Sequence, residues 1–326
     1  MKKYSKIRWG IIGCGDVTEV KSGPGFQKAE GSELIAVMRR SVDLAKDYAL
    51  RHSVPKWYDN ATTLINDPEV DAVYIATPPS SHKEYTFAAA LAGKPVYVEK
   101  PMAMNYTECM EMVKFCKDAG APLFVAYYRR ALPRFLKIKS LIEDGAIGEV
   151  RLVNMQFRQP ASVNDKKGIH GWRLDPSIAG CGYFCDLGSH MLDLIQYFLG
   201  KIISAQGEVS NLGNYYKTED TVSALFKFES GAHGIANWCF DAAEEFDKTE
   251  IIGSKGKIIY SNFADASVKL IKESNEEEFY VKHPEHIAQP LIQTVVNELI
   301  GKEKCPSTGE TGAYTSFIMD KILGRV

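Results

Sequence analysis

The sequence predicts an α/β protein that begins with a doubly wound parallel sheet and continues into a large, mostly antiparallel sheet. Over about the first 125 residues, short apolar strands alternate with helical segments, which is typical of parallel sheets. From Val150 onward most segments alternate apolar and polar residues, which is typical of a sheet with one covered face. Turn residues at 230–231 and 254–256 join such segments as hairpins.

A glycine turn follows the first predicted strand, Ile7–Ile12. Gly13 and Gly15 come directly after this apolar run, and a polar segment that can open a helix comes next. One glycine makes the tight turn, another lets the backbone approach a pyrophosphate, and the helix start offers unpaired N–H groups. The chain contains three Gly-x-Gly pairs, and about two are expected by chance. This pair is therefore evidence for a nucleotide site only because it directly follows a predicted strand. The alternative is an ordinary strand–turn–helix corner.

The other elements of the parallel part follow in order. Ser-Gly-Pro-Gly at 22–25 breaks the first helix or splits it in two. Asn105 caps a helix, with Glu108 as its capping-box partner. Strands are expected at 34–38, 71–77, 96–98 and 123–126, and helices at 43–52, 61–66 and 82–92.

The end of the second strand carries Arg39, Arg40 and Ser41, about twenty residues beyond the glycine turn. An acidic residue there would bind the ribose 2′-hydroxyl of NAD, whereas arginine accepts the 2′-phosphate of NADP. No acid occurs at 38–42. The sequence therefore favours NADP(H), with NAD(H) as the other cofactor and two solvated surface charges as the alternative interpretation.

The second part of the chain is predicted from its period-two pattern and its closing helices. Strands are expected at 151–159, 221–228, 232–240, 249–253 and 257–260, and helices at 133–144, 183–199, 287–300 and 312–323. We predict a nucleotide-binding domain at 1–122 and a domain for substrate binding and subunit contacts at 123–326.

Composition excludes several classes of protein. The 326 residues carry a net charge of −2 without long charged runs, which argues against nucleic-acid binding. No segment is long and apolar enough for a membrane span. Seven cysteines without a Cys-x-x-Cys pair suggest reduced thiols in a cytoplasm.

Two clusters carry candidate chemistry. Lys100 ends a buried strand over the predicted cofactor crevice, and Pro101 turns the chain away there; a lone lysine would otherwise be a solvated charge. In segment 180–190, Asp186 and His190 are four residues apart and share a helix face, with Asp193 three residues further on. The alternatives are a core histidine and a metal site, but no third ligand has convincing spacing, so we predict no metal.

These motifs together resemble the glucose–fructose oxidoreductase / inositol 2-dehydrogenase (Gfo/Idh/MocA) family over essentially the whole chain. The most specific signal is Glu99-Lys100-Pro101 followed by the Gly-x-Gly-x-x-x-Asp-x-Gly-x-His segment at 180–190. The other matching residues include Gly13 to Val17, Thr77, Pro78, His82, Tyr128, Trp172 and Arg173. The chain departs from the family at Thr18, where a small apolar residue is usual, and at Tyr128, where many relatives have Asn.

The resemblance implies a Rossmann domain, a C-terminal domain whose open sheet makes subunit contacts, and a homodimer or homotetramer. It implies that Lys100, Asp186 and His190 are catalytic and, with Tyr128 and Arg173, contact the substrate. It implies a cofactor site made of Gly13, Gly15, Asp16, Val17, Arg39, Arg40, Ser41, Thr77, Pro78, His82, Glu99, Lys100 and Trp172.

The implied activity is hydride transfer between a nicotinamide cofactor and a sugar, cyclitol or related diol or ketone. His190 can donate a proton to the reacting oxygen near neutral pH, and Lys100 can stabilise its charge. The spacing of Arg173, Asp186 and His190 also resembles that of anhydrofructose reductases. The alternative function is cleavage of a glycoside by an enzyme that keeps and recycles a tightly bound NAD.

Overall fold

The computed structural model describes residues 5–273 and 275–326, which form two compact units. The first unit comprises the chain up to Leu132 together with Pro284–Ala313. The second comprises Pro133–His283 and Tyr314–Val326. The units are thus interleaved in sequence, whereas the predicted domains, 1–122 and 123–326, are consecutive. That domain assignment stays a prediction, and each unit is described by itself.

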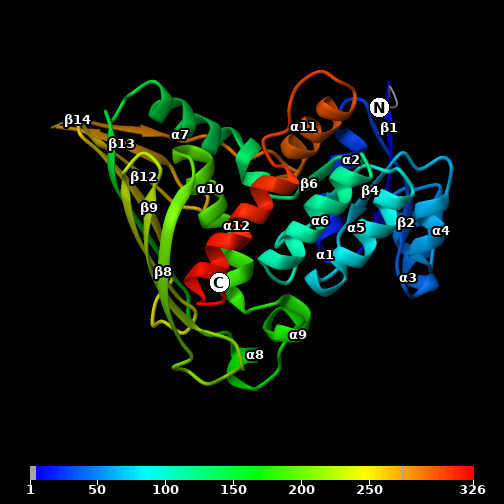
Figure 1. The fold of residues 1–326 in the computed structure, drawn as a ribbon, viewed down its shortest axis with the longest axis horizontal. Helices are drawn as coiled ribbons and strands as arrows, with labels where there is room; N and C mark the ends of the chain where they lie inside the picture. Colours follow the sequence, from blue (N-terminus) through cyan, green and yellow to red (C-terminus); the bar gives the residue numbers. More distant parts are fainter. Residues whose placement is uncertain (1–4, 274) are drawn as a thin grey trace. The chain divides into compact units, whose positions relative to one another are not determined.

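The first unit contains the predicted parallel sheet, in the strand order β3-β2-β1-β4-β5-β6 (Figure 1). Its strands are β1 Ile7–Ile12, β2 Ser32–Met38, β3 Lys56–Tyr58, β4 Ala72–Ile75, β5 Val96–Val98 and β6 Leu123–Val125. Its helices are α1 Asp16–Val20, α2 Gly23–Lys28, α3 Val42–Arg51, α4 Ala61–Asn66, α5 His82–Leu91, α6 Tyr106–Asp118 and α11 Gln289–Leu299. The strand order reverses between β1 and β4, which places a ligand crevice beyond the carboxyl ends of these two strands.

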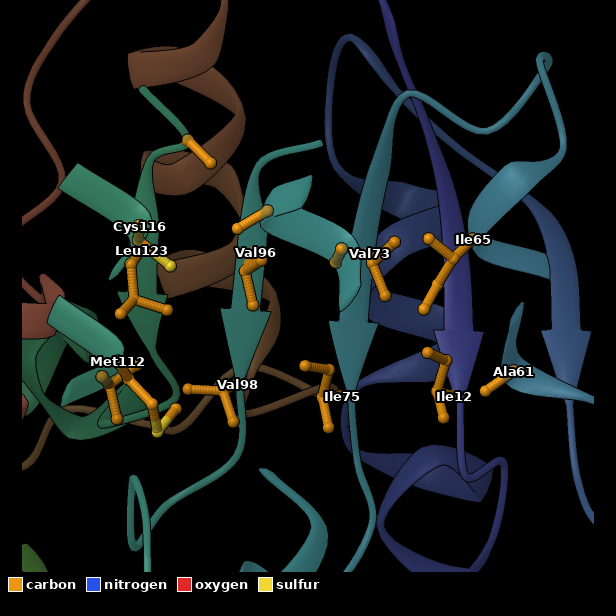
Figure 2. Close-up of a cluster of buried hydrophobic side chains, with 14 of the residues drawn as sticks. Ile12, Ala61, Ile65, Val73, Ile75, Val96, Val98, Met112, Cys116 and Leu123 are labelled. Atoms are coloured by element: carbon orange, nitrogen blue, oxygen red, sulfur yellow. The ribbon is translucent and has the colours of Figure 1, made fainter. Parts of the chain in front are cut away.

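The core explains why β1 is a continuous apolar run. Ile7, Trp9 and Ile11 belong to one buried cluster, together with side chains of α2 and α11. Ile12 belongs to the cluster on the opposite face, where Ile75, Val98 and Met112 also lie (Figure 2). A strand that is buried on both faces has no solvent-facing position left for polar residues.

The second unit contains the predicted mostly antiparallel sheet, in the order β14-β13-β12-β11-β7-β10-β9-β8 (Figure 1). Its strands are β7 Val150–Arg158, β8 Ile202–Ser210, β9 Thr221–Phe228, β10 His233–Cys239, β11 Phe246–Gly253, β12 Lys257–Tyr260, β13 Val268–Lys272 and β14 Asn275–Phe279. Only β7 and β10 pair in parallel among these neighbours.

Helices cover one face of this sheet, as the alternating pattern predicts. The helices are α7 Pro133–Glu143, α8 Val163–Lys166, α9 Pro176–Ala179 and α10 Ser189–Leu199, and α12 Gly309–Ile322 passes from the first unit into this one. The indole of Trp238 on β10 packs edge-on against Phe184 and donates to the Met191 sulfur of α10, at 3.1 Å. Phe135 of α7 packs against Tyr260 of β12, with 6.1 Å between ring centroids.

Segment 180–190 differs from the predicted single helix. Phe184–Gly188 forms a π-helical turn, and α10 begins only at Ser189. A Cβ atom on Gly188 would lie 2.6 Å from the Phe184 ring, and one on Gly182 would lie 2.3 Å from the Thr218 hydroxyl. The two glycines therefore permit close packing around a type of turn that is frequent at functional sites.

The expectation of reduced thiols is wrong for two cysteines. Cys181 and Cys185, four residues apart, form a disulfide with their Cα atoms 5.6 Å apart, which lies within the range that a disulfide spans. The π-helical segment brings these two positions together, whereas the sequence analysis considered only Cys-x-x-Cys spacing. The other five cysteines are not part of a disulfide. Within 5–273 and 275–326, we find no helix with the length and apolarity needed to span a membrane.

Candidate functional site

The glycine turn lies beside the end of β2. The amides of Gly13 and Cys14 donate to the Met38 carbonyl oxygen, at 2.9 and 3.1 Å. Gly13 has a φ of +89°, and a Cβ there would lie 2.7 Å from the Thr77 side chain, so only glycine fits. A Cβ on Gly15 would have no neighbour closer than 4.0 Å. The turn thus leaves open space over Gly15, where a pyrophosphate needs to approach the backbone.

Thr18 is compatible with this turn although it departs from the usual motif. It is fully buried, and its hydroxyl donates to the Gly15 carbonyl oxygen at 2.7 Å. The Tyr48 hydroxyl donates to the Thr18 carbonyl at 2.8 Å, which ties α1 to α3. α1 starts at Asp16 and Val17 and ends at Val20, and α2 starts at Gly23, which confirms the predicted split of the first helix.

Arg39, Arg40 and Ser41 follow β2 and are all exposed. Neither guanidinium forms an ion pair with a residue that the structure describes, and the Ser41 hydroxyl makes no capping hydrogen bond although Ser41 is the N-cap of α3. The Met38 carbonyl accepts hydrogen bonds from the glycine turn, and Arg39 is the next residue, so these three residues begin directly beside that turn. Their guanidinium and hydroxyl donors suit a phosphate group.

His82 joins the segments that follow β4 and β5. It is fully buried, with Nε2 2.7 Å from the Thr77 carbonyl and Nδ1 3.1 Å from the Pro101 carbonyl. Burial lowers the pKa of His82, and the carbonyl oxygens around the ring partly oppose that shift. Its polar contacts go to the chain itself, so the geometry favours a positioning role. Direct contact of His82 with the cofactor stays a prediction.

Glu99 and Lys100 follow β5 and are partly buried. The Tyr74 hydroxyl donates to the Glu99 carboxylate, and the Lys100 amide donates to its other oxygen at 3.1 Å. Burial raises the pKa of Glu99, while the Tyr74 hydrogen bond and the Lys100 ammonium act in the opposite direction. The carboxylate is thus held between Tyr74 of β4 and the backbone of Lys100. No local pattern marks Tyr74 for this role, because its sequence context is that of an ordinary buried strand.

Tyr128 lies in a short 3₁₀ turn, Tyr128–Ala131, after β6. The Arg129 guanidinium donates to its hydroxyl at 2.7 Å and lies 4.8 Å from its ring centroid. Arg130 is buried and donates to the Pro306 carbonyl at 2.6 Å, which anchors the turn. The phenol is therefore held in place by its neighbours in the first unit.

In the second unit, Trp172, Arg173 and Asp186 form one chain of contacts. The Arg173 guanidinium lies 4.5 Å from the Trp172 ring centroid, and its Nε is 3.4 Å from the Asp186 carboxylate. The ion pair joins the 3₁₀ turn Trp172–Leu174 to the π-helical turn. The structure thus brings together three residues that the sequence predicted for cofactor and substrate.

His190 lies in the first turn of α10 and is 4% exposed. Its ring packs edge-on against Phe263, with 6.3 Å between centroids. Asp247 fixes the segment that carries Phe263, since it accepts the amides of Asn262 and Phe263 at 3.1 and 2.6 Å. No sequence signal marks this loop, because only tertiary packing brings residue 263 to His190.

Asp193 is buried and accepts a hydrogen bond from Thr315 at 3.2 Å. This contact gives Asp193 a partner on α12, within the second unit. No group of three or more His, Cys, Asp or Glu side chains suited to a metal ion occurs in the described part of the chain.

Two family models match the chain. The model described as the oxidoreductase family, NAD-binding Rossmann fold, matches residues 7–127. The model of the GFO/IDH/MocA C-terminal domain matches residues 135–259.

Individual relatives match over nearly the whole length. Oxidoreductase P35 of Formosa agariphila is 40% identical over 321 residues, which cover 98% of this chain and 99% of the relative. A 1,5-anhydro-D-fructose reductase of Ensifer adhaerens is 27% identical, over 94% of this chain and 92% of its own. A solved levoglucosan dehydrogenase, in complex with NADH and levoglucosan, has a TM-score of 0.87 and 23% identity, and the match covers 98% of this chain and 97% of that one. At that identity the likeness shows the fold.

Proposed function

Since the chain belongs to the Gfo/Idh/MocA family of NAD(P)-dependent oxidoreductases, we propose that it transfers a hydride between NADP(H) and a sugar, cyclitol or related diol or ketone. The observation that carries the proposal is the glycine turn, open over Gly15, with the exposed Arg39 and Arg40 after the next strand, in a chain that also contains Lys100, Asp186 and His190.

The residues of the first unit fit a bound dinucleotide. Gly15 leaves room for the pyrophosphate, the amides of Asp16 and Val17 lie at the start of α1, and Arg39, Arg40 and Ser41 suit a 2′-phosphate. We assign Thr77, Pro78 and Glu99 to the same site, since they follow β4 and β5, and Trp172 to the nicotinamide side. The bound nicotinamide supplies or accepts the hydride.

The chain itself contributes the charge and the proton. We assign Lys100 to the reacting oxygen, where its ammonium stabilises the negative charge that develops as hydride is delivered. We assign His190 to the proton of the same oxygen, which it gives in reduction and takes in oxidation. Arg173 and Tyr128 contact the substrate. Asp186, which pairs with Arg173, positions the substrate or His190.

The test is a substrate screen with sugars and inosose-like ketones, followed by NADPH absorbance, with NADH in parallel. Oxidation of NADPH by any of these carbonyl compounds supports the proposal. Cofactor that survives purification, together with glycoside cleavage and no net turnover of added NADP, would favour the glycoside-cleaving alternative instead.

We expect the double variant Arg39→Ala, Arg40→Ala to lose most of its NADPH affinity and little of its NADH affinity. A charge-assisted hydrogen bond contributes about 1.5–3 kcal/mol, so the loss should be about ten- to a hundredfold for each contact removed. Dissociation constants of both cofactors, measured by fluorescence titration, check this. Arg151→Ala is the matched control, since that side chain is exposed on β7 and pairs with Glu149. Equal weakening of both cofactors, or a wild type that prefers NADH, contradicts the prediction.

We also propose that the open face of the second sheet makes subunit contacts in a homodimer or homotetramer. Leu225 and Ile235 are paired neighbours on β9 and β10, and they are 62% and 51% exposed. Leu152 of β7, beside His233, adds a third exposed apolar side chain to the same sheet. Apolar neighbours of this kind on one sheet face are typical of interaction surfaces.

Leu225→Lys and Ile235→Lys should each shift the protein toward monomer, because an interface would have to bury an unpaired ammonium. Light scattering coupled to size exclusion measures the mass. Leu91→Lys, on an exposed position of α5, should leave the mass unchanged. A wild-type monomer, or variants that keep the wild-type mass, would contradict the assignment.

A further inference from the structure

The second unit contains a pocket of about 1000 Å³, whose lining shares only Trp172 with the residues assigned to a role above. Its walls come from two segments, residues 170–178 and 214–217. The volume lies at the upper end of the range for small-molecule sites, so the pocket can hold more than one small ring.

The pocket combines aromatic surface with hydrogen-bonding groups. Trp172, Tyr215 and Tyr216 supply rings, and His170, Asn214 and Lys217 supply donors and acceptors. A pyranose ring has this same dual character, because its C–H faces pack on aromatic rings while its hydroxyls bind polar groups at the edge. The Tyr216 hydroxyl is buried and has no hydrogen-bond partner among the residues that the structure describes. That hydroxyl is also inaccessible to solvent, so it lies beneath the pocket wall, and the polar groups that a ligand can reach belong to the other lining residues.

The two walls are held in place before any ligand binds. Asp220 accepts the amides of Leu212 and Gly213 at 3.0 and 2.7 Å, which fixes the segment leading to Tyr215. Tyr216 packs edge-on against His170, with ring centroids 6.0 Å apart, so the two walls touch. A prearranged pocket loses less conformational entropy on binding than a mobile one.

Trp172 connects this pocket to a residue of the proposed substrate site. It lines the pocket, and the guanidinium of its neighbour Arg173 lies on its ring and pairs with Asp186. A ligand that contacts Trp172 in the pocket would therefore lie close to Arg173, the next residue in the sequence.

We propose that this pocket is a saccharide subsite, which binds a sugar unit attached to the one that is oxidised or reduced. The inference rests on the proposed function and deepens it: the substrate class is a glycoside or short oligosaccharide rather than a free monosaccharide. Tyr215 and Lys217 are then specificity-determining residues.

The test uses the full-length protein and a panel of neutral and uronate-containing disaccharides and trisaccharides, each with its constituent monosaccharides. Calorimetric titration should show at least one oligosaccharide that binds about tenfold or more tightly than its monosaccharides, as one aromatic contact and its hydrogen bonds allow. Tyr215→Ala should abolish most of this gain, and Lys217→Ala should reduce it, while both keep the wild-type affinity for monosaccharides.

Tyr280→Ala, an exposed tyrosine outside the pocket, is the matched control and should keep the gain. The inference is wrong if no oligosaccharide binds more tightly than its monosaccharides, or if the gain survives both pocket variants. Failure of the proposed function looks different: no sugar drives NADPH oxidation, whereas the gain and its loss in Tyr215→Ala persist.

Discussion

Lys100→Met should lower kcat by about 10²- to 10³-fold, as the loss of a preorganised charge-stabilising donor does in other enzymes. Lys100 follows β5 and its amide is anchored on Glu99, so the backbone should keep its position when the ammonium is removed. Methionine retains most of the length and apolar stem of lysine. The fold and the affinity for NADPH should therefore stay near wild type, since the ammonium acts on the reacting oxygen and not on the pyrophosphate.

The measurements are kcat, the NADPH dissociation constant and the melting temperature, for this variant and for Lys114→Met. Lys114 is an exposed lysine on α6 that pairs with Asp118 in the next turn, so its loss should change none of the three quantities. A Lys100→Met enzyme that turns over nearly as fast as wild type would make Lys100 a surface charge without a catalytic role.

His190→Asn should reduce turnover by about 10²- to 10⁴-fold and should flatten the pH profile. Protonated His190 gives its proton to the carbonyl oxygen in reduction, so reduction should fall at high pH. Neutral His190 must accept the proton in oxidation, so oxidation should fall at low pH, through the same ionisation. Asparagine cannot titrate in this range, and both limbs should disappear.

Asp186→Asn tests the role of His190 as proton donor by removing the predicted neighbouring carboxylate. The sequence predicts Asp186 beside His190, and a carboxylate in that place favours the protonated imidazole, so its removal should move the shared ionisation to lower pH. Asp186 also pairs with Arg173, and the substitution should therefore raise KM as well. The pH series of kcat/KM in both directions, with His233→Asn as the control on an exposed histidine of β10, decides the question. If the pH profile of His190→Asn keeps the wild-type dependence, the proton comes from another group, with Lys100 or Tyr128 as the next candidates.

Local chemistry was enough to predict much of the first unit. β1, α4 and β5 have the bounds that the sequence predicts, because buried parallel strands and amphipathic helices carry their own patterns. Asn105 caps α6 as predicted and accepts the Glu108 amide at 3.0 Å. The Glu108 carboxylate, however, accepts from Met104 rather than from Asn105, so the reciprocal half of the predicted capping box is wrong. The amide that the Glu108 carboxylate accepts is therefore that of the residue before the N-cap.

Four strands were not assigned from the sequence, β3, β8, β13 and β14, and all of them except β13 are short or carry few apolar residues. β3 has three residues, and β14 is Asn-Glu-Glu-Glu-Phe at the edge of its sheet. Charged residues protect an edge strand from pairing with other chains, and they also remove the apolar alternation that would reveal it. β8, at the opposite edge, is exposed along most of its length.

The sequence by itself determined the fold class, the glycine turn and the identity of the candidate side chains, because strand periodicity, turn residues and motif spacing are local properties. Only the tertiary structure decided what each side chain contacts. It tied His82 to the carbonyls that follow β4 and β5, paired Asp186 with Arg173, and placed Phe263 against His190. These contacts join residues 5 to 73 positions apart in the chain, and chain folding, rather than any local pattern, sets the distances between them.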